Sequence, residues 1–297
     1  MFFTGFADEA AGDIDGQIRA TRELGWDYIE ARNVNGRNIH DIPEKEFDEV
    51  CGKLSDAGVR INCFGSNIAN WGKNITDPFD SSLEEARRAI QRMKRLGTSC
   101  VRVMSFGVLK DRDPGAQWEK ERFRRLRKLV RMFADEGLLP LHENCANYGG
   151  MGAAFTLHLL ENVPGLRLVF DTGNPIVTPD YEKPLPRPRQ SSWDFYERVR
   201  DYVDYIHIKD GVFVRALPGA IFDEAQFTWP GNGDGDVNRI VTDLLARGYD
   251  GGFSIEPHLA VLYHLAQGQT DDEARYAGYI EYGRRFMRLV TEAQAPS

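Results

Sequence analysis

The sequence predicts an α/β fold, a single closed (β/α)8 TIM barrel, and three observations lead to it. Helical stretches end at a glycine and run directly into a β-rich segment, at Gly25, Gly58, Gly97, Gly137, Gly165 and Gly248. Glycine adopts the left-handed conformation that closes a helix before a strand. Strands that alternate with helices are typical of a parallel sheet. One barrel commonly fills about 250 residues, so we expect residues 1–297 to form one domain.

Eight strands are predicted, at 3–6, 28–31, 59–65, 100–106, 138–143, 166–171, 203–207 and 252–256. The intervening segments carry apolar stripes at helical spacing, for example Phe47, Val50, Cys51, Leu54 and Ala57. An open, doubly wound sheet is the alternative fold. That fold would need a glycine-rich turn after the first strand, and FADEAAGD at 6–13 is a poor one.

Two connections are longer than a barrel requires. They span 172–192, which is rich in proline, and 211–235, and they follow the sixth and seventh strands. Loops after barrel strands lie over the catalytic face, so we expect lids or subunit contacts there, with surface decoration as the alternative for the first. The glycine-rich run PGNGDGD at 230–236 has two interpretations, a phosphate-binding loop or a glycine turn in which Asp236 caps the next helix. The run contains no basic residue, so the glycine turn is favoured. The basic run at 120–131 lies on an amphipathic helix and is interpreted as a solvated face.

The composition of the chain argues against some classes of binding partner. Lys plus Arg number 37 and Asp plus Glu 45, a formal net charge of −8 that disfavours nucleic acid and anionic membranes. Apolar runs stay well below the roughly 20 residues of a membrane span. The four cysteines form no C-x-x-C pair and the N-terminus has no basic leader, so a reducing cytoplasm is expected. A homo-oligomer, dimer or tetramer, is an open expectation.

The last four strands each end in a potential metal ligand. The endings LPLHENC, LRLVFDTGN, YIHIKD and GFSIEPH contribute, in order, Glu143, Asp171, His207 and Glu256. Strand alternation places each ligand on the same face as apolar residues that would fill the barrel. Three carboxylates and one imidazole suit Mn²⁺ best, with Mg²⁺, Co²⁺ or Zn²⁺ as alternatives. The competing interpretation is four unrelated polar strand ends.

Further candidates surround these ligands. Lys209 shares the inward parity of His207, and His258 follows Glu256 by two residues, so both are candidate substrate contacts or supports for the ligands. Asp210 is expected to orient Lys209 or His207. Glu30, Arg32, Asn67 and Trp71 are candidates for the opposite wall of a substrate site, with ordinary packing as the alternative for Trp71.

The segments HENC, FDTGN, HIKD and SIEPH, with the opening GFADEAAGDIDGQIRATRELGWDYIEAR, resemble the xylose isomerase-like barrel superfamily, in particular its sugar phosphate isomerase/epimerase branch. The resemblance implies that Glu143, Asp171, His207 and Glu256 bind one divalent cation. It also implies that Glu143 and Glu256 act as the acid/base pair. This chain has Asn174 where ketose epimerases usually have histidine, and Phe213, with Arg215 nearby, where they have arginine. Asn174 and Arg215 are therefore expected to contact a different, sugar-like substrate.

The expected function is a metal-dependent isomerase or epimerase that abstracts a proton beside the carbonyl of a ketose, keto-sugar or cyclitol. A metal stabilises the enediolate formed, and two carboxylates remove and return the proton. The main alternative is a lyase or dehydratase that eliminates from an inosose or a 3-keto glycoside. An apurinic-endonuclease-like hydrolase fits poorly with six histidines and an acidic chain. A non-catalytic sugar-binding subunit is the remaining alternative.

Overall fold

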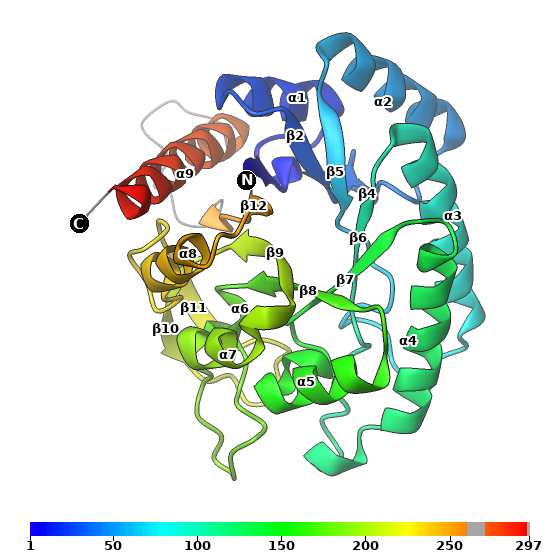
Figure 1. Ribbon diagram of the computed structural model, residues 1–297, viewed down its shortest axis with the longest axis vertical. Helices are drawn as coiled ribbons and strands as arrows, with labels where there is room; N and C mark the ends of the chain where they lie inside the picture. The colour runs from blue at the N-terminus through cyan, green and yellow to red at the C-terminus, as the bar shows by residue number, and fades with distance from the viewer. Residues whose placement is uncertain (260–270, 296–297) are drawn as a thin grey trace.

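Eight parallel strands form one curved sheet in the computed structural model, which describes residues 1–259 and 271–295. Along the sheet the order is β1, β12, β9, β8, β7, β6, β5 and β2, so consecutive barrel strands are neighbours (Figure 1). The strands are β1 (Phe2–Gly5), β2 (Tyr28–Ala31), β5 (Arg60–Phe64), β6 (Cys100–Val103), β7 (Leu139–Glu143), β8 (Arg167–Asp171), β9 (Val203–Ile208) and β12 (Gly252–Ile255). This arrangement confirms the predicted barrel.

The barrel closes between its first two strands. In the described part of the chain, β1 and β2 share no ladder, and one isolated parallel bridge between Phe6 and Glu30 joins them. This bridge lies just beyond the end of β1, where the carboxyl ends of the strands face the barrel mouth. The backbone of Glu30 therefore lies where β1 and β2 close the barrel.

Helices surround the sheet (Figure 1). They are α1 (Ile14–Glu23), α2 (Glu44–Ala57), α3 (Asp80–Leu96), α4 (Glu119–Ala134), α5 (Ala153–Asn162), α7 (Ser192–Val199), α8 (Val237–Ala246) and α9 (Asp271–Gln294). The six glycines predicted to precede strands all have positive φ, between 62° and 86°. Gly58 and Gly97 are the left-handed C-caps of α2 and α3, as the sequence pattern predicted.

The large apolar core lies between the strands and the helices, where residues such as Phe47, Leu126 and Phe253 are buried. The barrel interior holds a smaller cluster made of Cys63, Leu141, Val169 and Tyr205. Leu141, Val169 and Tyr205 each lie two residues before a predicted metal ligand on the same strand. Because side chains alternate along a strand, this apolar layer directs the ligands into the mouth.

Both long connections contain regular structure. The first includes the short helix α6 (Asn174–Val177) directly after β8. The second forms an antiparallel hairpin of β10 (Gly211–Arg215) and β11 (Glu224–Phe227), which the sequence analysis did not predict. A small hairpin of β3 (Asn33–Val34) and β4 (Arg37–Asn38) follows β2. Among the described residues, no helix combines the length and apolar character needed to cross a membrane.

Candidate active site

The four predicted metal ligands meet at the carboxyl end of the barrel. Glu143 and Asp171 are the last residues of β7 and β8, His207 lies near the end of β9, and Glu256 follows β12 directly. His207 is in register with Asp171 on one side and with Ser254 on the other. All four side chains are buried. The parallel register thus brings together residues that are far apart in the sequence.

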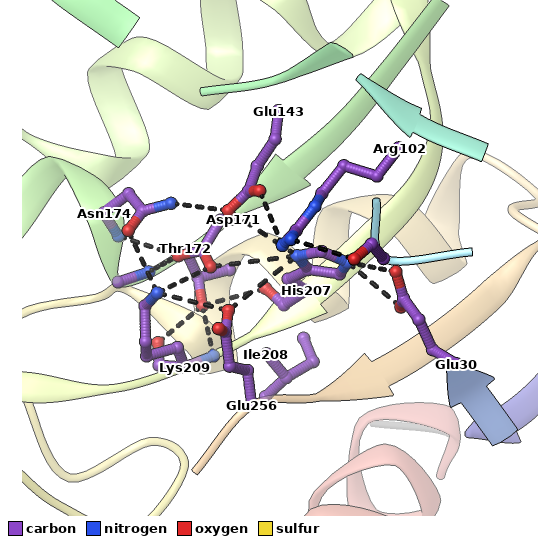
Figure 2. A network of polar contacts seen from close by, with 12 residues as sticks. Glu30, Arg102, Glu143, Asp171, Thr172, Asn174, His207, Ile208, Lys209 and Glu256 are labelled. Atoms are coloured by element: carbon purple, nitrogen blue, oxygen red, sulfur yellow. Dashed lines mark hydrogen bonds and ion pairs between the residues drawn. The ribbon is translucent and has the colours of Figure 1, made fainter. Parts of the chain in front are cut away.

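One ring nitrogen of His207 faces the three carboxylates (Figure 2). Its Nδ1 lies 3.8 Å from Glu143 Oε1, 3.9 Å from Asp171 Oδ2 and 3.9 Å from Glu256 Oε2. Although it is buried, Nδ1 has no hydrogen-bond partner among the described residues. Donor atoms from all four residues lie within 4.8 Å of one another.

Glu30 fixes the orientation of that ring. His207 Nε2 lies 3.1 Å from both Glu30 oxygens, and both side chains are fully buried. A carboxylate only accepts hydrogen bonds, so Nε2 carries the hydrogen and Nδ1 faces the carboxylates. Glu30 was expected to form a wall of the substrate site. The structure instead places it behind His207 and outside the cavity lining, because strand parity points it into the barrel at the closing seam.

Charge around these donors favours a bound cation. Burial and the neighbouring Glu256 and Glu143 raise the pKa of Asp171 to about 7, although Lys209 opposes the rise. Burial lowers the pKa of His207, but Glu30 and Glu143 outweigh it and raise that pKa to about 10. The cluster thus takes up protons to balance its carboxylates. A divalent ion would supply the same positive charge, so hard oxygen donors and one imidazole fit such an ion.

Backbone and side-chain hydrogen bonds hold Asp171 and Glu143 in place. Asp171 Oδ1 accepts from the backbone N–H groups of Gly173 and Asn174, at 2.8 and 2.7 Å. Asn144, next to Glu143, bonds both the N–H and the C=O of Asp171 across the strand ends. Asn174 Nδ2 donates to Glu143 Oε1 at 2.9 Å. The turn after β8 therefore connects two of the candidate ligands.

Three cationic side chains accompany the carboxylates. Lys209 Nζ lies 2.9 Å from Asp171 Oδ2 and 3.2 Å from Glu256 Oε2. Arg102 of β6 lies 3.0 Å from Glu143 Oε2, and Arg32, just after β2, lies 3.0 Å from Glu256 Oε1. The sequence indicated Arg32 only as a candidate for the opposite wall of the substrate site, and it did not indicate Arg102. The sequence feature that could have indicated them is an arginine within or at the end of an otherwise apolar strand. In CVRVM, for example, strand alternation places Arg102 on the same face as Cys100.

His258 belongs to a second layer of contacts around Glu256. Its backbone N–H and its Nδ1 contact the two oxygens of Glu9, at 2.7 and 2.9 Å, and its Nε2 lies 3.6 Å from Glu256 Oε1. Arg32 also pairs with Glu9 and with Asp8. His258 has φ of 52°, an uncommon conformation for this residue type that these contacts hold.

A cavity of about 510 Å³ opens above the candidate metal ligands. Five of the seven predicted substrate contacts line it, namely Asn67, Trp71, Asn174, Lys209 and His258. Glu30 and Arg215 do not. Arg215 lies on β10, its side chain is 69% exposed, and it pairs with Glu224 across the hairpin at 2.6 Å. The unpredicted hairpin explains this outcome, because its pairing places Arg215 at the last position of β10, opposite Glu224 of β11.

The glycine-rich run at 230–236 binds a carboxylate of the protein itself. Asp210 accepts hydrogen bonds from the backbone N–H groups of Gly211, Gly231, Gly233 and Gly235, at 2.9 to 3.0 Å. The expected roles of Asp210 and Asp236 were therefore wrong. Asp210 anchors this loop, and Asp236 adopts φ of 51° without a side-chain cap to α8, so only the glycine turn itself is confirmed.

Comparison with known families agrees with this arrangement. The profile of the xylose isomerase-like TIM barrel family matches residues 18–280. The chain belongs to this family. No curated protein matches the chain.

Solved structures of xylose isomerase-like fold resemble the chain over nearly its whole length. A xylose isomerase-like TIM barrel protein from Mycobacterium smegmatis, in complex with magnesium, is 17% identical, with 99% of this chain and 97% of that chain covered and a TM-score of 0.68. The probable 3-DHS dehydratase of petrobactin synthesis from Bacillus anthracis is 14% identical, with 94% and 97% covered and a TM-score of 0.66. The 3-keto-D-glucoside 4-epimerase from E. coli is 16% identical, with 92% and 94% covered and a TM-score of 0.59. At these identities the likeness concerns the fold.

Proposed function

We propose that this protein is a divalent-metal-dependent isomerase or epimerase of a sugar-like substrate, a ketose, keto-sugar or cyclitol. The observation that carries the proposal is the convergence of three carboxylate oxygens on His207 Nδ1 at the floor of a cavity of about 510 Å³. Glu143, Asp171, His207 and Glu256 would hold the cation. When bound, a divalent ion polarises a carbonyl and acidifies the adjacent C–H.

The acid/base work falls to Glu143 and Glu256. They come from β7 and from the end of β12, with His207 of β9 between them (Figure 2). Burial raises the pKa of Glu143, but Arg102 and His207 outweigh it and hold that pKa at about 2. Lys209 and His258 help to hold the pKa of Glu256 well below its usual range against burial. Both groups are thus ionised at neutral pH, and one can accept a substrate proton that the other returns from the opposite face.

Lys209 and Asn174 are the proposed contacts to the substrate oxygens. Lys209 Nζ donates to Asn174 Oδ1 at 3.0 Å and to Glu256 Oε2 at 3.2 Å, so its position is fixed before a ligand arrives. An ammonium group at this point stabilises negative charge that develops on a substrate oxygen during proton removal. Preorganised donors lower the barrier because they need not reorient during the reaction.

The proposal is tested with Mn²⁺-loaded protein and a panel of ketoses, inososes and 3-keto glycosides in deuterated water. Proton NMR should show exchange of one C–H beside the carbonyl, with formation of an epimer or an isomer. Protein treated with EDTA is the control and should show no exchange. Absence of exchange and of product with every member of the panel, in protein shown to contain the metal, would contradict the proposed activity.

Elimination is the second candidate activity, because it begins with the same proton abstraction. The fold similarity to a probable dehydratase supports keeping it, as does His258, an acid/base side chain that lines the cavity with its Nε2 at 3.6 Å from Glu256 Oε1. The same NMR experiment separates the two. Elimination creates a new olefinic signal and releases a leaving group, whereas epimerisation replaces one C–H by C–D and keeps every substituent on the sugar.

The proposal also covers the metal, the partners and the location of the protein. Mn²⁺ is the proposed ion, and Mg²⁺, Co²⁺ and Zn²⁺ are compared with it in the same assay. The proposed partner is a small carbohydrate rather than nucleic acid or a membrane, and the proposed location is the cytoplasm. A dimer or tetramer is proposed, which light scattering on the purified protein would test.

A further inference from the structure

Four apolar side chains line one part of the cavity, here called its upper part. Trp71, from the connection between β5 and α3, meets Phe222, from the connection between β10 and β11, at 5.6 Å between ring centroids and an interplanar angle of 81°. Met104, just after β6, and Val177, the last residue of α6, also line the cavity. Trp71 remains 37% exposed. These four side chains come from four separate connections and face one space.

Charge is concentrated on the floor instead. Of the described residues that line the cavity, the Arg and Lys side chains are Arg32, Arg102 and Lys209, and each is paired with Glu256, Glu143 or Asp171. The charged residues near the apolar part are acidic. Asp223 accepts a hydrogen bond from the Leu217 N–H, and Glu224 pairs with Arg215. The described lining of the upper part therefore offers no cation to a phosphate group.

The cavity is also larger than a free sugar requires. Its volume of about 510 Å³ lies within the range of about 300–1,000 Å³ that holds drug-sized ligands. A free hexose has only a dozen non-hydrogen atoms. If its reacting carbons lie at the floor between Glu143 and Glu256, the space next to Trp71 and Phe222 stays unfilled. A substituent on the sugar would occupy that space.

We propose that Trp71, Phe222, Met104 and Val177 form a subsite for a flat, uncharged, apolar substituent of the sugar, such as the aromatic ring of an aryl glycoside. This inference rests on the proposed function, because it assigns the reacting sugar to the floor. Aromatic rings prefer edge-to-face or offset contacts with centroids about 4.5–7 Å apart. The Trp71–Phe222 pair already has this geometry, and a ligand ring packed beside the pair in the cavity extends the cluster and buries apolar surface.

The test compares ligands that share one sugar. Binding of methyl 3-keto-β-D-glucoside, phenyl 3-keto-β-D-glucoside and a 3-keto-glucoside 6-phosphate to the Mn²⁺-loaded protein is measured by calorimetry. Burial of one ring predicts that the phenyl glycoside binds at least about tenfold more tightly than the methyl glycoside. Trp71→Ala and Phe222→Ala should each reduce that ratio to about threefold or less. Trp71→Phe, which keeps an aromatic ring, should preserve most of it.

Two control variants remove exposed apolar side chains outside the cavity lining. Trp118 is 50% exposed and Val214 is 51% exposed, so Trp118→Ala and Val214→Ala should leave the ratio unchanged. Equal affinity for the phenyl and methyl glycosides in the wild type, or a ratio that survives both Trp71→Ala and Phe222→Ala, would overturn the subsite. Tighter binding of the phosphate than of the phenyl glycoside would also overturn it.

Failure of the subsite differs from failure of the proposed function. If the phenyl preference is present but no ligand exchanges a C–H in deuterated water, the subsite stands and the proposed reaction falls. If ketoses react but the phenyl group confers no preference, the reaction stands and the subsite falls. Thermal unfolding of each variant confirms that the altered ratios come from folded protein.

Discussion

Both oxygens of Glu30 lie 3.1 Å from His207 Nε2, and this contact determines which nitrogen of the ring faces the three carboxylates. A buried carboxylate behind a histidine ligand orients the ring and raises its basicity, and loss of such a partner typically costs about 10–100-fold in metal affinity. Glu30→Gln should therefore weaken Mn²⁺ binding by about that factor, measured by calorimetry. Glu161→Gln, at a side chain that is 71% exposed, is the control and should bind as the wild type does.

Metal binding should stabilise the fold. An ion present at about 100 times its dissociation constant adds about 2.7 kcal/mol, which for a chain of this size corresponds to a rise in melting temperature of about 4 °C. Thermal unfolding with Mn²⁺ and with EDTA measures this rise. Asp171→Asn should remove most of it, whereas the exposed Asp56→Asn should retain it. An unchanged rise in Asp171→Asn would exclude Asp171 as a ligand.

Glu256 has its two oxygens in different contacts, one with Arg32 and one with Lys209. Glu256→Gln keeps the shape of the side chain but removes its capacity to accept a proton. We expect kcat to fall by about 10²–10⁴-fold, as followed by C–H exchange at saturating Mn²⁺. Circular dichroism should show an unchanged fold, and full activity in the variant would remove Glu256 from the acid/base pair.

Arg102 is 5% exposed and pairs with Glu143 at 3.0 Å. Replacing it by methionine leaves a buried carboxylate without this partner, and breaking a buried ion pair typically costs about 3–5 kcal/mol. Urea unfolding of Arg102→Met in EDTA should show a loss of that size, and Mn²⁺ should recover part of it. Arg288→Met is the matched control, because Arg288 pairs with Glu281 at an exposed position and should change stability by less than about 1 kcal/mol.

His142 links stability to pH. Burial lowers its pKa from 6.5 to about 4, although its hydrogen bond with Asn147 and the neighbouring Glu143 oppose the shift. Between these values the unfolded chain binds more protons than the folded one. Stability from this residue is therefore present above pH 6.5 and is lost as pH falls toward 4, by about 3 kcal/mol in total.

Urea unfolding of EDTA-treated protein between pH 4 and 7 measures this linkage. The wild type should lose free energy of unfolding more steeply with acidification than His142→Gln does. The side chain of His142 is fully buried and contacts Ser105 Oγ and Asn147 Oδ1, so the variant is also expected to be less stable at pH 7. Parallel pH profiles for the two proteins would contradict the assignment.

The sequence predicted that the four candidate metal ligands would meet, because each one ends or directly follows an apolar strand segment. Alternation along a strand and the common direction of parallel strands are enough to place Glu143, Asp171, His207 and Glu256 together. Arg102 was not predicted, and Arg32 was predicted only as part of the opposite wall, because a charge in or beside a strand shows no partner until the strand order is known. The hairpin of β10 and β11 was not predicted either, and its pairing left Arg215 outside the cavity.

Arg122, outside the candidate site, also has contacts that the sequence did not predict. The basic run at 120–131 was interpreted as a solvated face, yet Arg122 is fully buried and donates to the backbone carbonyls of Phe106 and Gly107, at 3.1 and 2.8 Å. Helical spacing shows which residues share a face, but it does not show that a neighbouring loop brings unpaired carbonyl groups to that face. The interpretation was therefore wrong for Arg122, and also for Arg125, which is buried as well.

Local rules thus determined the barrel from the sequence alone, since glycine caps, apolar stripes and strand alternation act over a few residues. Tertiary structure decided the partners of each charge. Glu30 supports His207 rather than forming a wall, and Asp210 binds a glycine loop rather than orienting Lys209. The physical reason is that buried charges are satisfied by whichever group the fold brings within about 3 Å, and this group is usually distant along the chain.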